Sequence, residues 1–460
     1  MSSARDLVLR CLPFAADPAL EVCIVGSLAL AEACERSGLA DRPDTHDIDL
    51  AWRLPVPEAL RVLENAGFEV TQTKGALDRG TIGVRTPIQR FEITSFRGGG
   101  SEPDERITQD ALRRDMTIGA VLWRIHDDTI HDPLGGLEDW KRGIIRACGD
   151  AGERLAEHAI RALRYLRRGA ELGFALDERT RRAIRTHATN VRDSVTPEAV
   201  AEELRRVLAG HSPGLFFALA SEEGLLEHLI PEVHPLFDGR AAGRIRWHPE
   251  MSQGLHTVLT LRAAAMLAER DRLDDAARLR LLLGVLCHDL GKGRTRPGEL
   301  PSHPGHDMAG TPLIDSLFDR FPGLGDRRAR RFCHVVARTH VLLLRLEELR
   351  VGTLVDLWER EFSPIRDDLP LLAAAVRADH DGRLAPESIG LRRRTSHADI
   401  GWQLERRILR SLERLDGILR EVRGDDVAQR FADEPQKIRA ALHELRCRAI
   451  HDADQRNDAT

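Results

Sequence analysis

The hydrophobic pattern changes near residue 150, and this change constrains what the chain can fold into. Before it, short apolar runs are separated by turn residues, as where residues 21–25 run into Gly26-Ser27. Such runs are typical of strands in a mixed sheet. After Glu153, Arg, Glu, Leu and Ala recur with helical spacing. We therefore expect an α+β N-terminal part followed by a mostly α-helical remainder.

The expected elements and domains follow from this pattern. In the first part we expect strands at 21–25 and 47–52, a helix at 28–34, and a hairpin of 81–84 and 90–96. In the second part we expect helices at 154–172, 177–187, 197–208, 215–228, 254–271 and 275–290, with a frayed polar tail after Asp452. We divide the chain into a head (1–150), a neck (151–235), a metal-binding domain (236–385) and a helical tail (386–460).

Composition excludes some classes of protein and leaves others open. The chain has no apolar run long enough to span a membrane, and its seven cysteines lack Cys-x-x-Cys spacing, which favours a reduced cytoplasmic protein. The net charge of −5 does not indicate nucleic-acid binding. Arginine clusters nevertheless occur locally at 113–114, 161–168, 327–331 and 392–394. Each cluster is either a solvated helix face or part of a groove for an RNA backbone.

An acidic pair in the first part is a candidate metal site. Asp47 and Asp49 are separated by one residue, so on a strand both side chains point to one face, about 7 Å apart. Mg²⁺ prefers such oxygen ligands and completes its shell with water and substrate phosphates. The Gly26-Ser27 turn offers backbone N–H groups to a triphosphate, and Glu92 is the best candidate for a third carboxylate. The alternative is a solvated strand edge.

A histidine-aspartate pair far along the chain is a second candidate metal site. His288-Asp289 closes an apolar helix just before a glycine turn, and His256 and Asp379 provide further ligands of the same kinds. Mixed imidazole and carboxylate ligands suit a transition metal such as Mn²⁺, Ni²⁺, Co²⁺ or Fe²⁺. The alternative is an ordinary helix C-terminus. Two more histidines could serve a second ion or a phosphate: His306 and His340.

Several strings in the first part resemble the class II tRNA nucleotidyltransferases, which are the CCA-adding enzymes and their poly(A) polymerase relatives. The strings are Val25-Gly26-Ser27, Asp47-Ile48-Asp49, Gly80-Thr81, residues 91–97 (FEITSFR), 113–118 (RRDMTI) and 132–139 (DPLGGLED). The resemblance implies a DNA polymerase β-like head in which Asp47 and Asp49 bind catalytic Mg²⁺ with help from Glu92. It also implies a set of nucleotide-binding residues: Gly26, Ser27, Arg114, Asp115, Glu157, Arg161 and Arg164.

Strings in the second part resemble the HD phosphohydrolase domain of multifunctional bacterial CCA proteins. They are residues 247–250 (WHPE), 254–257 (GLHT) and 286–293 (LCHDLGKG). The resemblance implies His256, His288, Asp289 and Asp379 as ligands of Ni²⁺, Mn²⁺ or Co²⁺, and Lys292 as a phosphate contact alongside His306 and His340. It further implies 2′,3′-cyclic phosphodiesterase, 2′-nucleotidase and phosphatase activities.

The favoured interpretation is an enzyme that adds C, C and A to tRNA 3′ ends from CTP and ATP and trims phosphates from RNA ends. A second hypothesis is a phosphohydrolase with a drifted head, because His158 stands where the family's Glu-Asp-x-x-Arg motif has Asp. A third is an RNA-binding or regulatory protein without either activity. The expected partner is tRNA or another structured RNA, with no membrane, and a homodimer is left open.

Overall fold

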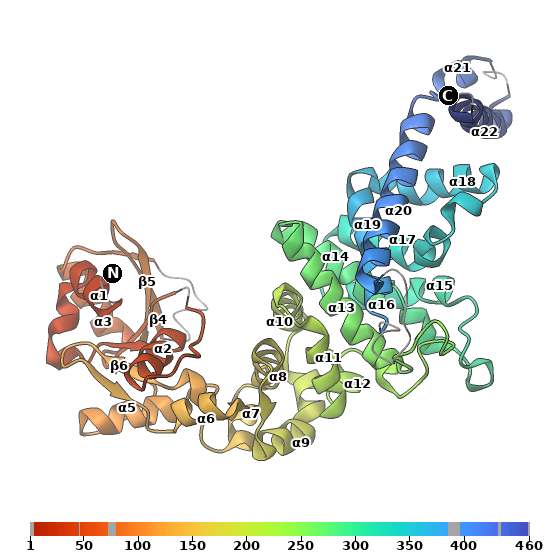
Figure 1. Ribbon diagram of the computed structural model, residues 1–460. Coiled ribbons are helices and arrows are strands. Elements are labelled where there is room, and N and C mark those ends of the chain that lie inside the picture. Colours follow the sequence, from red (N-terminus) through yellow and green to blue (C-terminus); the bar gives the residue numbers. More distant parts are fainter. Residues whose placement is uncertain (1–3, 46, 72–79, 385–395, 431–433, 459–460) are drawn as a thin grey trace. The chain divides into compact units, whose positions relative to one another are not determined.

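The structure is a computed structural model that describes residues 4–45, 47–71, 80–384, 396–430 and 434–458. The chain divides into two compact units, Met1–Ser194 and Val195–Thr460, and each is described by itself (Figure 1). The predicted domain boundaries at 150, 235 and 385 lie within these units and stay predictions. Within the described residues, no helix has both the length and the apolar character needed to cross a membrane.

The first unit is built on a seven-stranded mixed sheet with the strand order β3-β4-β5-β2-β1-β6-β7. Its strands are β1 (Cys23–Val25), β2 (Asp49–Trp52), β3 (Glu69–Thr71), β4 (Thr81–Arg85), β5 (Arg90–Ser95), β6 (Leu122–Arg124) and β7 (Thr129–His131). Among these described strands, β2 and β5 pair in parallel and the other neighbours pair antiparallel. The predicted hairpin is therefore present as β4 and β5. The predicted strand at 47–52 begins only at Asp49, so Asp47 lies just before it.

Helices cover this sheet and continue beyond it. They are α1 (Ala4–Cys11), α2 (Ser27–Arg36), α3 (Val56–Asn65), α5 (Pro103–Leu112), α6 (Gly136–Arg142), α7 (Ala151–Glu157), α8 (Arg161–Leu172) and α9 (Glu178–Ser194). One face of the sheet buries Val25 and Leu122 against Ile107 and Ala111 of α5. A short pair, β8 (Ile144–Ile145) and β9 (Ala175–Leu176), joins the sheet region to α8.

The prediction of one helix over 154–172 is wrong, because the chain forms α7 and then α8 with a break at His158. At the break, the Arg161 guanidinium donates to the carbonyl of Arg154, which also accepts the backbone N–H of His158. The Arg161 side chain thus bridges the first residue of α8 and the last turn of α7. The break puts the end of α7 and the start of α8 next to one another.

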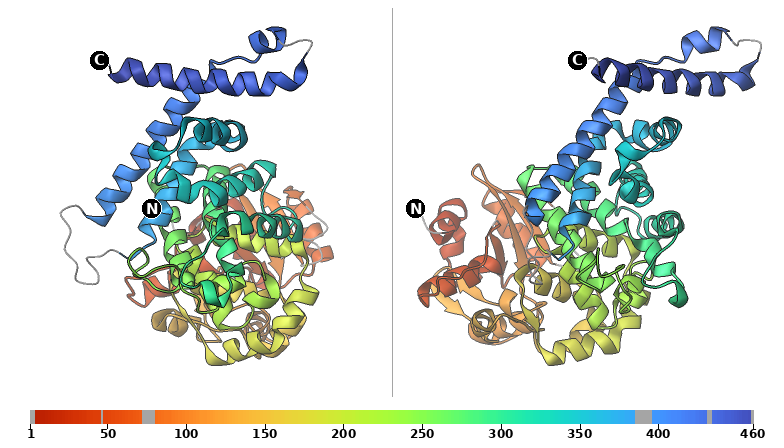
Figure 2. Two further views of the ribbon diagram at one scale, coloured as in Figure 1. Left: turned by 90° about the vertical axis from the view of Figure 1, so that its right-hand side faces the viewer. Right: turned by 45° about the vertical axis from the view of Figure 1, so that its right-hand side comes forward.

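The second unit consists of helices. They are α10 (Pro197–Ala209), α11 (Pro213–Glu222), α12 (Leu226–Leu229), α13 (Gln253–Arg270), α14 (Asp275–Cys287), α15 (His306–Ala309), α16 (Thr311–Arg320), α17 (Arg327–Leu343), α18 (Val351–Leu357), α19 (Leu369–Asp381), α20 (His397–Arg420), α21 (Asp425–Arg430) and α22 (Pro435–Asp458). Helices α13, α14, α17 and α19 pack together, and Gly284 lets α14 approach α17, since a Cβ there would lie 2.6 Å from Phe332. In both views of Figure 2, α20 leads away from this core toward α22, which it contacts.

Three predictions about helices in this unit are wrong. The helix predicted over 215–228 is two helices, α11, which ends at Glu222, and α12. The helix predicted over 275–290 ends at Cys287, so His288 and Asp289 follow its last turn. The tail predicted to fray after Asp452 is helical as far as Asp458, because α22 packs on α18 and α20. The predicted fold class, an α+β head followed by helices, is confirmed.

Candidate functional sites

The parallel register of β2 and β5 brings two of the predicted carboxylates together. Asp49 begins β2, and its Cα is paired with the Cα of Glu92 on β5. Neighbouring strands lie about 4.8 Å apart, so both side chains stand on one face of the sheet at adjacent positions. Asp47 comes two residues earlier, and all three side chains are exposed. The pKa of Asp49 is raised, because its carboxyl group is partly desolvated and because Glu92 and Asp47 carry negative charge nearby.

The Gly26-Ser27 turn lies beside Asp49, one of these three carboxylates. Gly26 has a φ of 75°, a conformation that favours glycine, and a Cβ at this position would lie 4.0 Å from Oδ2 of Asp49. Ser27 is the first residue of α2. The first backbone N–H groups of a helix have no partner within the helix, and the helix dipole favours anions there. A phosphate can therefore be held beside the three carboxylates.

A pocket of ≈ 620 Å³ lies where α7 meets α8. Its wall is formed by Arg97, Gly98, Arg113, Asp115, Glu157, His158, Ile160, Arg161 and Arg164. Asp115 accepts hydrogen bonds from Arg161 Nε and Arg164 Nη1, both at 2.7 Å. Burial by itself raises the pKa of Asp115, but these two guanidinium groups outweigh it and hold the pKa below its usual value. The pocket wall thus carries arginine side chains, two of which are held in place by the Asp115 carboxylate.

Arg161 is the most constrained residue of this pocket. Its side chain is 3% exposed, and its guanidinium donates to Asp115, Glu157 and the carbonyl of Arg113. The predicted nucleotide-binding residues Asp115, Glu157, Arg161 and Arg164 are therefore brought together in one wall. Arg114 lies apart from that wall: it pairs with Asp110, and its charge opposes the raised pKa of Asp49.

Four predicted ligands converge in the second unit. His256 Nε2 lies 3.1 Å from Oδ1 of Asp379 and 3.6 Å from Oδ2 of Asp289. His288 Nε2 lies 3.1 Å from the same Oδ2 of Asp289. All four side chains are buried. They come from α13, from the residues after α14, and from α19, so distant segments of the chain form one cluster.

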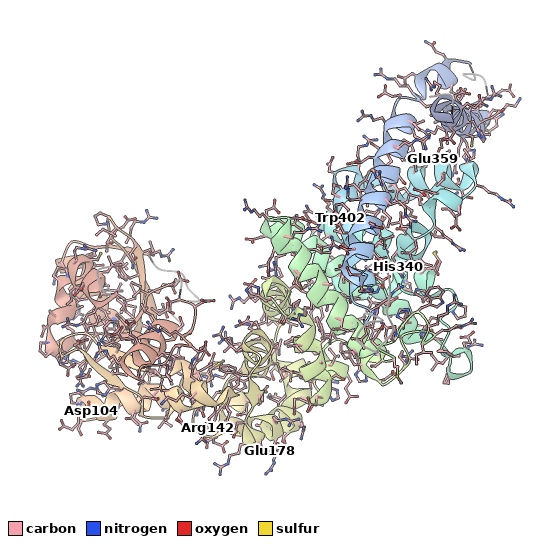
Figure 3. All side chains as sticks on the ribbon, viewed as in Figure 1. Asp104, Arg142, Glu178, His340, Glu359 and Trp402 are labelled. Carbon is pink, nitrogen blue, oxygen red and sulfur yellow. The ribbon has the colours of Figure 1, made fainter. Side chains whose placement is uncertain are left out.

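Two further histidines approach the other oxygen of Asp289. His306 Nε2 and His340 Nε2 lie 3.5 and 3.7 Å from Asp289 Oδ1, and they lie 3.4 Å from each other. Figure 3 places His340 among the helices of the second unit, where it belongs to α17. Asp289 therefore stands between two groups of imidazoles, one group on each carboxylate oxygen.

The residues of this cluster fit a divalent transition metal. Buried polar atoms normally have hydrogen-bond partners, yet among the described residues His256 Nε2, His288 Nε2 and Asp289 Oδ1 have none. Metal ligands must be neutral imidazoles and ionised carboxylates. Burial lowers the pKa of His340, which is not one of the four ligands, to about 4. Burial also acts to lower the pKa of His256, but Asp379 and Glu250 raise it above its usual value. Burial acts to raise the pKa of Asp289, but His288 and Lys292 hold it well below its usual range.

Lys292 lies in the wall of the adjoining pocket but is already engaged. Its ammonium is 2.7 Å from Asp289 Oδ2 and donates to the carbonyl of Ala242 at 2.9 Å. Lys292 therefore holds a ligand carboxylate in place, and its role as a phosphate contact stays a prediction. The pocket, of ≈ 650 Å³, is also lined by Arg244, Arg345 and Arg383, which offer further positive charge.

Comparison with known proteins places the chain in a family. The model described as "Poly A polymerase head domain" matches residues 34–146, and "Probable RNA and SrmB- binding site of polymerase A" matches 173–237. A multifunctional CCA protein of Xanthomonas campestris is 32% identical over 312 residues, which cover 66% of this chain and 73% of that protein. The chain belongs to the class II CCA-adding enzyme family. A multifunctional CCA protein of Tolumonas auensis is 34% identical over 276 residues, and the match spans 59% of this chain and 64% of that relative.

Solved structures of CCA-adding enzymes share the fold. A complex of a CCA-adding enzyme with ATP aligns with a TM-score of 0.61 and 17% identity, covering 97% of this chain and 90% of that chain. The Bacillus stearothermophilus CCA-adding enzyme in complex with CTP aligns with a TM-score of 0.57 and 19% identity, covering 96% and 95%. Both family-model matches end before His256 and do not reach the histidine cluster of this CCA-adding family member.

Three residues of the histidine cluster were not singled out from the sequence. Glu250 and His248 lie against His256, and Gln253 Nε2 donates to Asp289 Oδ2 at 3.1 Å. The string WHPE at 247–250 contains two of them, but nothing in its spacing shows which side chains turn inward. Their roles depend on how the loop before α13 folds back on that helix.

Proposed function

We propose that the head adds C, C and A to the 3′ end of tRNA from CTP and ATP. The observation that carries this proposal is the placement of Asp49 opposite Glu92, with Gly26 beside the same carboxylate. Exposed oxygen ligands suit Mg²⁺, which retains water and binds substrate phosphates. The complexes of similar CCA-adding enzymes with CTP and ATP, and the matched RNA-binding region, support the same substrates.

The reaction joins the RNA to a nucleotide in one displacement. The 3′-oxygen of the RNA attacks the α-phosphorus, its proton is lost, and the bond from that phosphorus to the bridging oxygen breaks to release pyrophosphate. Bound Mg²⁺ would supply Lewis-acid activation of the hydroxyl and neutralise the departing charge. Asp47, Asp49 and Glu92 would hold it. The start of α2 would bind the triphosphate through backbone N–H groups.

The pocket between α7 and α8 would hold the base and sugar of the incoming nucleotide. Arg161 is held rigidly by its bonds to Asp115 and Glu157, so it can present donors at a defined place. His158 is exposed in the same wall and offers a different set of donors and acceptors from an aspartate. Because of this difference, altered nucleotide choice or a drifted head is the alternative to CCA addition.

The deciding experiment uses purified protein, Mg²⁺ and tRNA lacking its terminal CCA. Each labelled triphosphate is supplied separately, and CTP and ATP are then supplied together. We expect ordered incorporation of C, C and A. Incorporation of a single or wrong nucleotide would indicate a specialised polymerase, and no incorporation would overturn the proposal for the head.

A second function is favoured by the histidine cluster. We propose that it holds Ni²⁺, Mn²⁺ or Co²⁺ and hydrolyses phosphate esters at RNA ends, including 2′,3′-cyclic phosphates. The bound metal would supply Lewis-acid activation of water and of the phosphoryl group. Arg244 and Arg345 line the adjoining pocket and would bind the phosphate charge, while Arg383, in the same wall, donates to Asp379. The test is hydrolysis of nucleoside 2′,3′-cyclic phosphate with each metal, and the absence of turnover with every metal would overturn it.

A further inference from the structure

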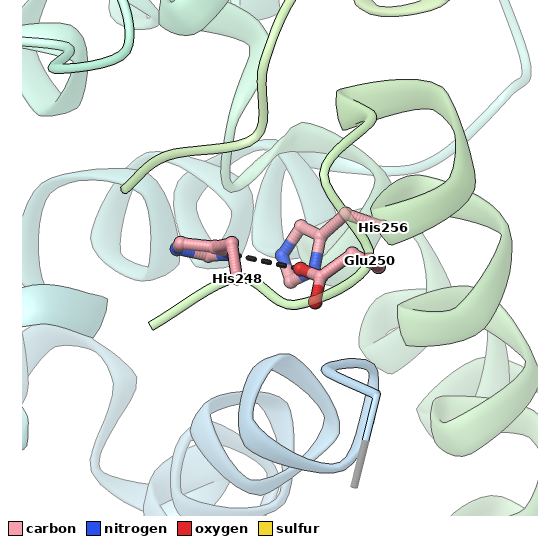
Figure 4. Close-up of side chains that lie close together, drawn as sticks. All are labelled: His248, Glu250 and His256. Atoms are coloured by element: carbon pink, nitrogen blue, oxygen red, sulfur yellow. Dashed lines mark hydrogen bonds and ion pairs between the residues drawn. The ribbon is translucent and has the colours of Figure 1, made fainter. Parts of the chain in front are cut away.

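Glu250 is a buried carboxylate that contacts two imidazoles. Its Oε1 lies 2.8 Å from Nδ1 of His248 and 3.0 Å from Nδ1 of His256, and the side chain is fully buried. Figure 4 shows the carboxylate between the two rings. Its Oε2 accepts the backbone N–H of Leu384 at 3.3 Å. Both carboxylate oxygens are therefore occupied, so the group is held in one orientation.

The backbone beside Glu250 is bent to allow this placement. Met251 has a φ of 62°, a left-handed conformation that is unfavourable for a residue with a Cβ. The bend is held by the bond from the Ala242 N–H to the Met251 carbonyl at 2.8 Å. Strain of this kind persists only where the surrounding structure imposes it, and it is concentrated at functional sites.

His256 differs from the other imidazoles of the cluster in what holds its second nitrogen. Nδ1 of His288 donates to the Val285 carbonyl at 2.5 Å, Nδ1 of His306 to the His303 carbonyl at 2.7 Å, and Nδ1 of His340 to the Ala337 carbonyl at 3.0 Å. Among the described residues, Nδ1 of His256 makes no such bond to a carbonyl; instead it lies 3.0 Å from Oε1 of the Glu250 carboxylate, as an ion pair. A carboxylate partner fixes the tautomer and makes the imidazole a more basic ligand than a carbonyl partner does.

We propose that Glu250 is the positioning residue of the metal centre: it holds a proton on His256 Nδ1 and thereby keeps Nε2 free to bind the ion. This inference rests on the proposed phosphohydrolase function. Glu250 also orients His248, a wall residue of the adjoining pocket, through the same oxygen. One carboxylate thus couples a metal ligand to the wall that faces the substrate.

The same three residues could instead form a metal site of their own, since their ligand atoms lie within 4.8 Å of one another. The geometry favours the positioning role. Nε2 of His256 already points at Asp379, and an ion bound between the Nδ1 atoms and Glu250 would require His256 to carry its proton on Nε2, which would remove that atom from the Asp289 and Asp379 cluster. The number of ions bound per chain therefore separates the two interpretations.

The test compares Glu250→Gln with Glu232→Gln in the full-length protein. Glu232 is a matched control because it is a buried carboxylate in the same unit, bonded to Arg320 and Ser316. Calorimetric titration with Mn²⁺ measures affinity and stoichiometry, and thermal unfolding without metal measures folding. We expect Glu250→Gln to weaken Mn²⁺ binding by about 10–100-fold, and Glu250→Asp to bind more tightly than Glu250→Gln because it keeps the charge. Glu232→Gln should bind as wild type does.

The outcomes distinguish this inference from the function on which it rests. If wild type binds no Mn²⁺, the proposed metal centre fails and this inference fails with it. If wild type binds but Glu250→Gln binds equally well, only the positioning role is overturned. If His248→Ala lowers the stoichiometry by one ion while cyclic phosphate hydrolysis persists, the three residues are a separate metal site and the positioning role is wrong.

Discussion

The two candidate metal sites use opposite designs. In the head, Asp49 and Glu92 are exposed on the face of a sheet, and Asp47 is exposed just before the strand that Asp49 begins. In the helical unit, His288 and Asp289 are buried with the other ligands. An open site of oxygen ligands leaves room for water, triphosphate and RNA, whereas a buried site of imidazoles and carboxylates holds its ion before substrate arrives. Under the two proposed functions, the head would take up its metal together with substrate, whereas the helical unit would keep a resident metal.

The largest expected effect is on catalysis in the head. Asp47→Ala with Asp49→Ala removes two carboxylates that would hold Mg²⁺. Several kcal/mol of transition-state stabilisation would be lost, which corresponds to a decrease in nucleotide addition on the order of 10³-fold or more. Cyclic phosphate hydrolysis should be unchanged. Glu69→Gln, an exposed carboxylate on β3 of the same sheet, is the control and should add nucleotides normally.

The next largest expected effect is on the activity of the histidine cluster in the second unit. His288→Ala with Asp289→Ala should abolish Mn²⁺ binding and phosphoesterase activity while CCA addition persists. The physical reason is that each residue supplies a ligand atom to the buried cluster. Both activities should be measured on one preparation. Loss of both activities in this variant and in the Asp47, Asp49 variant would mean that the sites are not independent.

Arg161→Lys should disturb the pocket between α7 and α8, with a smaller effect than either double substitution. The guanidinium donates to Asp115, Glu157 and the Arg113 carbonyl, and a single ammonium cannot reproduce that fork. We expect a loss of about 2–3 kcal/mol in unfolding free energy and relaxed choice between CTP and ATP. Chemical unfolding and competition assays measure the two effects. Unchanged nucleotide choice would contradict the role assigned to this pocket.

Metal should stabilise the second unit more than the first. A ligand at about 100 times its dissociation constant adds about 2.7 kcal/mol, which raises the unfolding temperature of a unit of this size by roughly 5–10 °C. We expect this rise with Mn²⁺ and a reversal by a chelator, measured by calorimetry. An equal rise in the His288→Ala, Asp289→Ala variant would show that the ion binds elsewhere.

The smallest effect concerns pH. The pKa of Asp115 is held below its usual value by Arg164 and Arg161, against the effect of burial. A depressed carboxyl pKa contributes stability above the unfolded-state value, near 3.9, and this contribution is lost as the pH falls through the folded-state value. Asp115→Asn should therefore be less stable than wild type by about 1–2 kcal/mol at pH 7. The gap should close as the pH falls below about 4. A gap that persists in acid would contradict this ion-pair account.

The sequence predicted the elements that local rules control. The hairpin of 81–84 and 90–96 is present as β4 and β5, and the change to helical spacing after Glu153 is a local pattern. Helix ends were predicted less well. At the break near His158, Arg161 contacts the Arg154 carbonyl, and no spacing rule predicts that contact.

What the sequence determined by itself is the chemistry available: a pair of aspartates behind a glycine turn, and a set of histidines and aspartates suited to a transition metal. The tertiary structure alone decided how those groups are held. Strand register set Asp49 beside Glu92, and the bend at Met251 turned Glu250 onto His256. Ligand types are properties of single residues, whereas the partners that orient them come from distant segments, which are brought together only when the core packs.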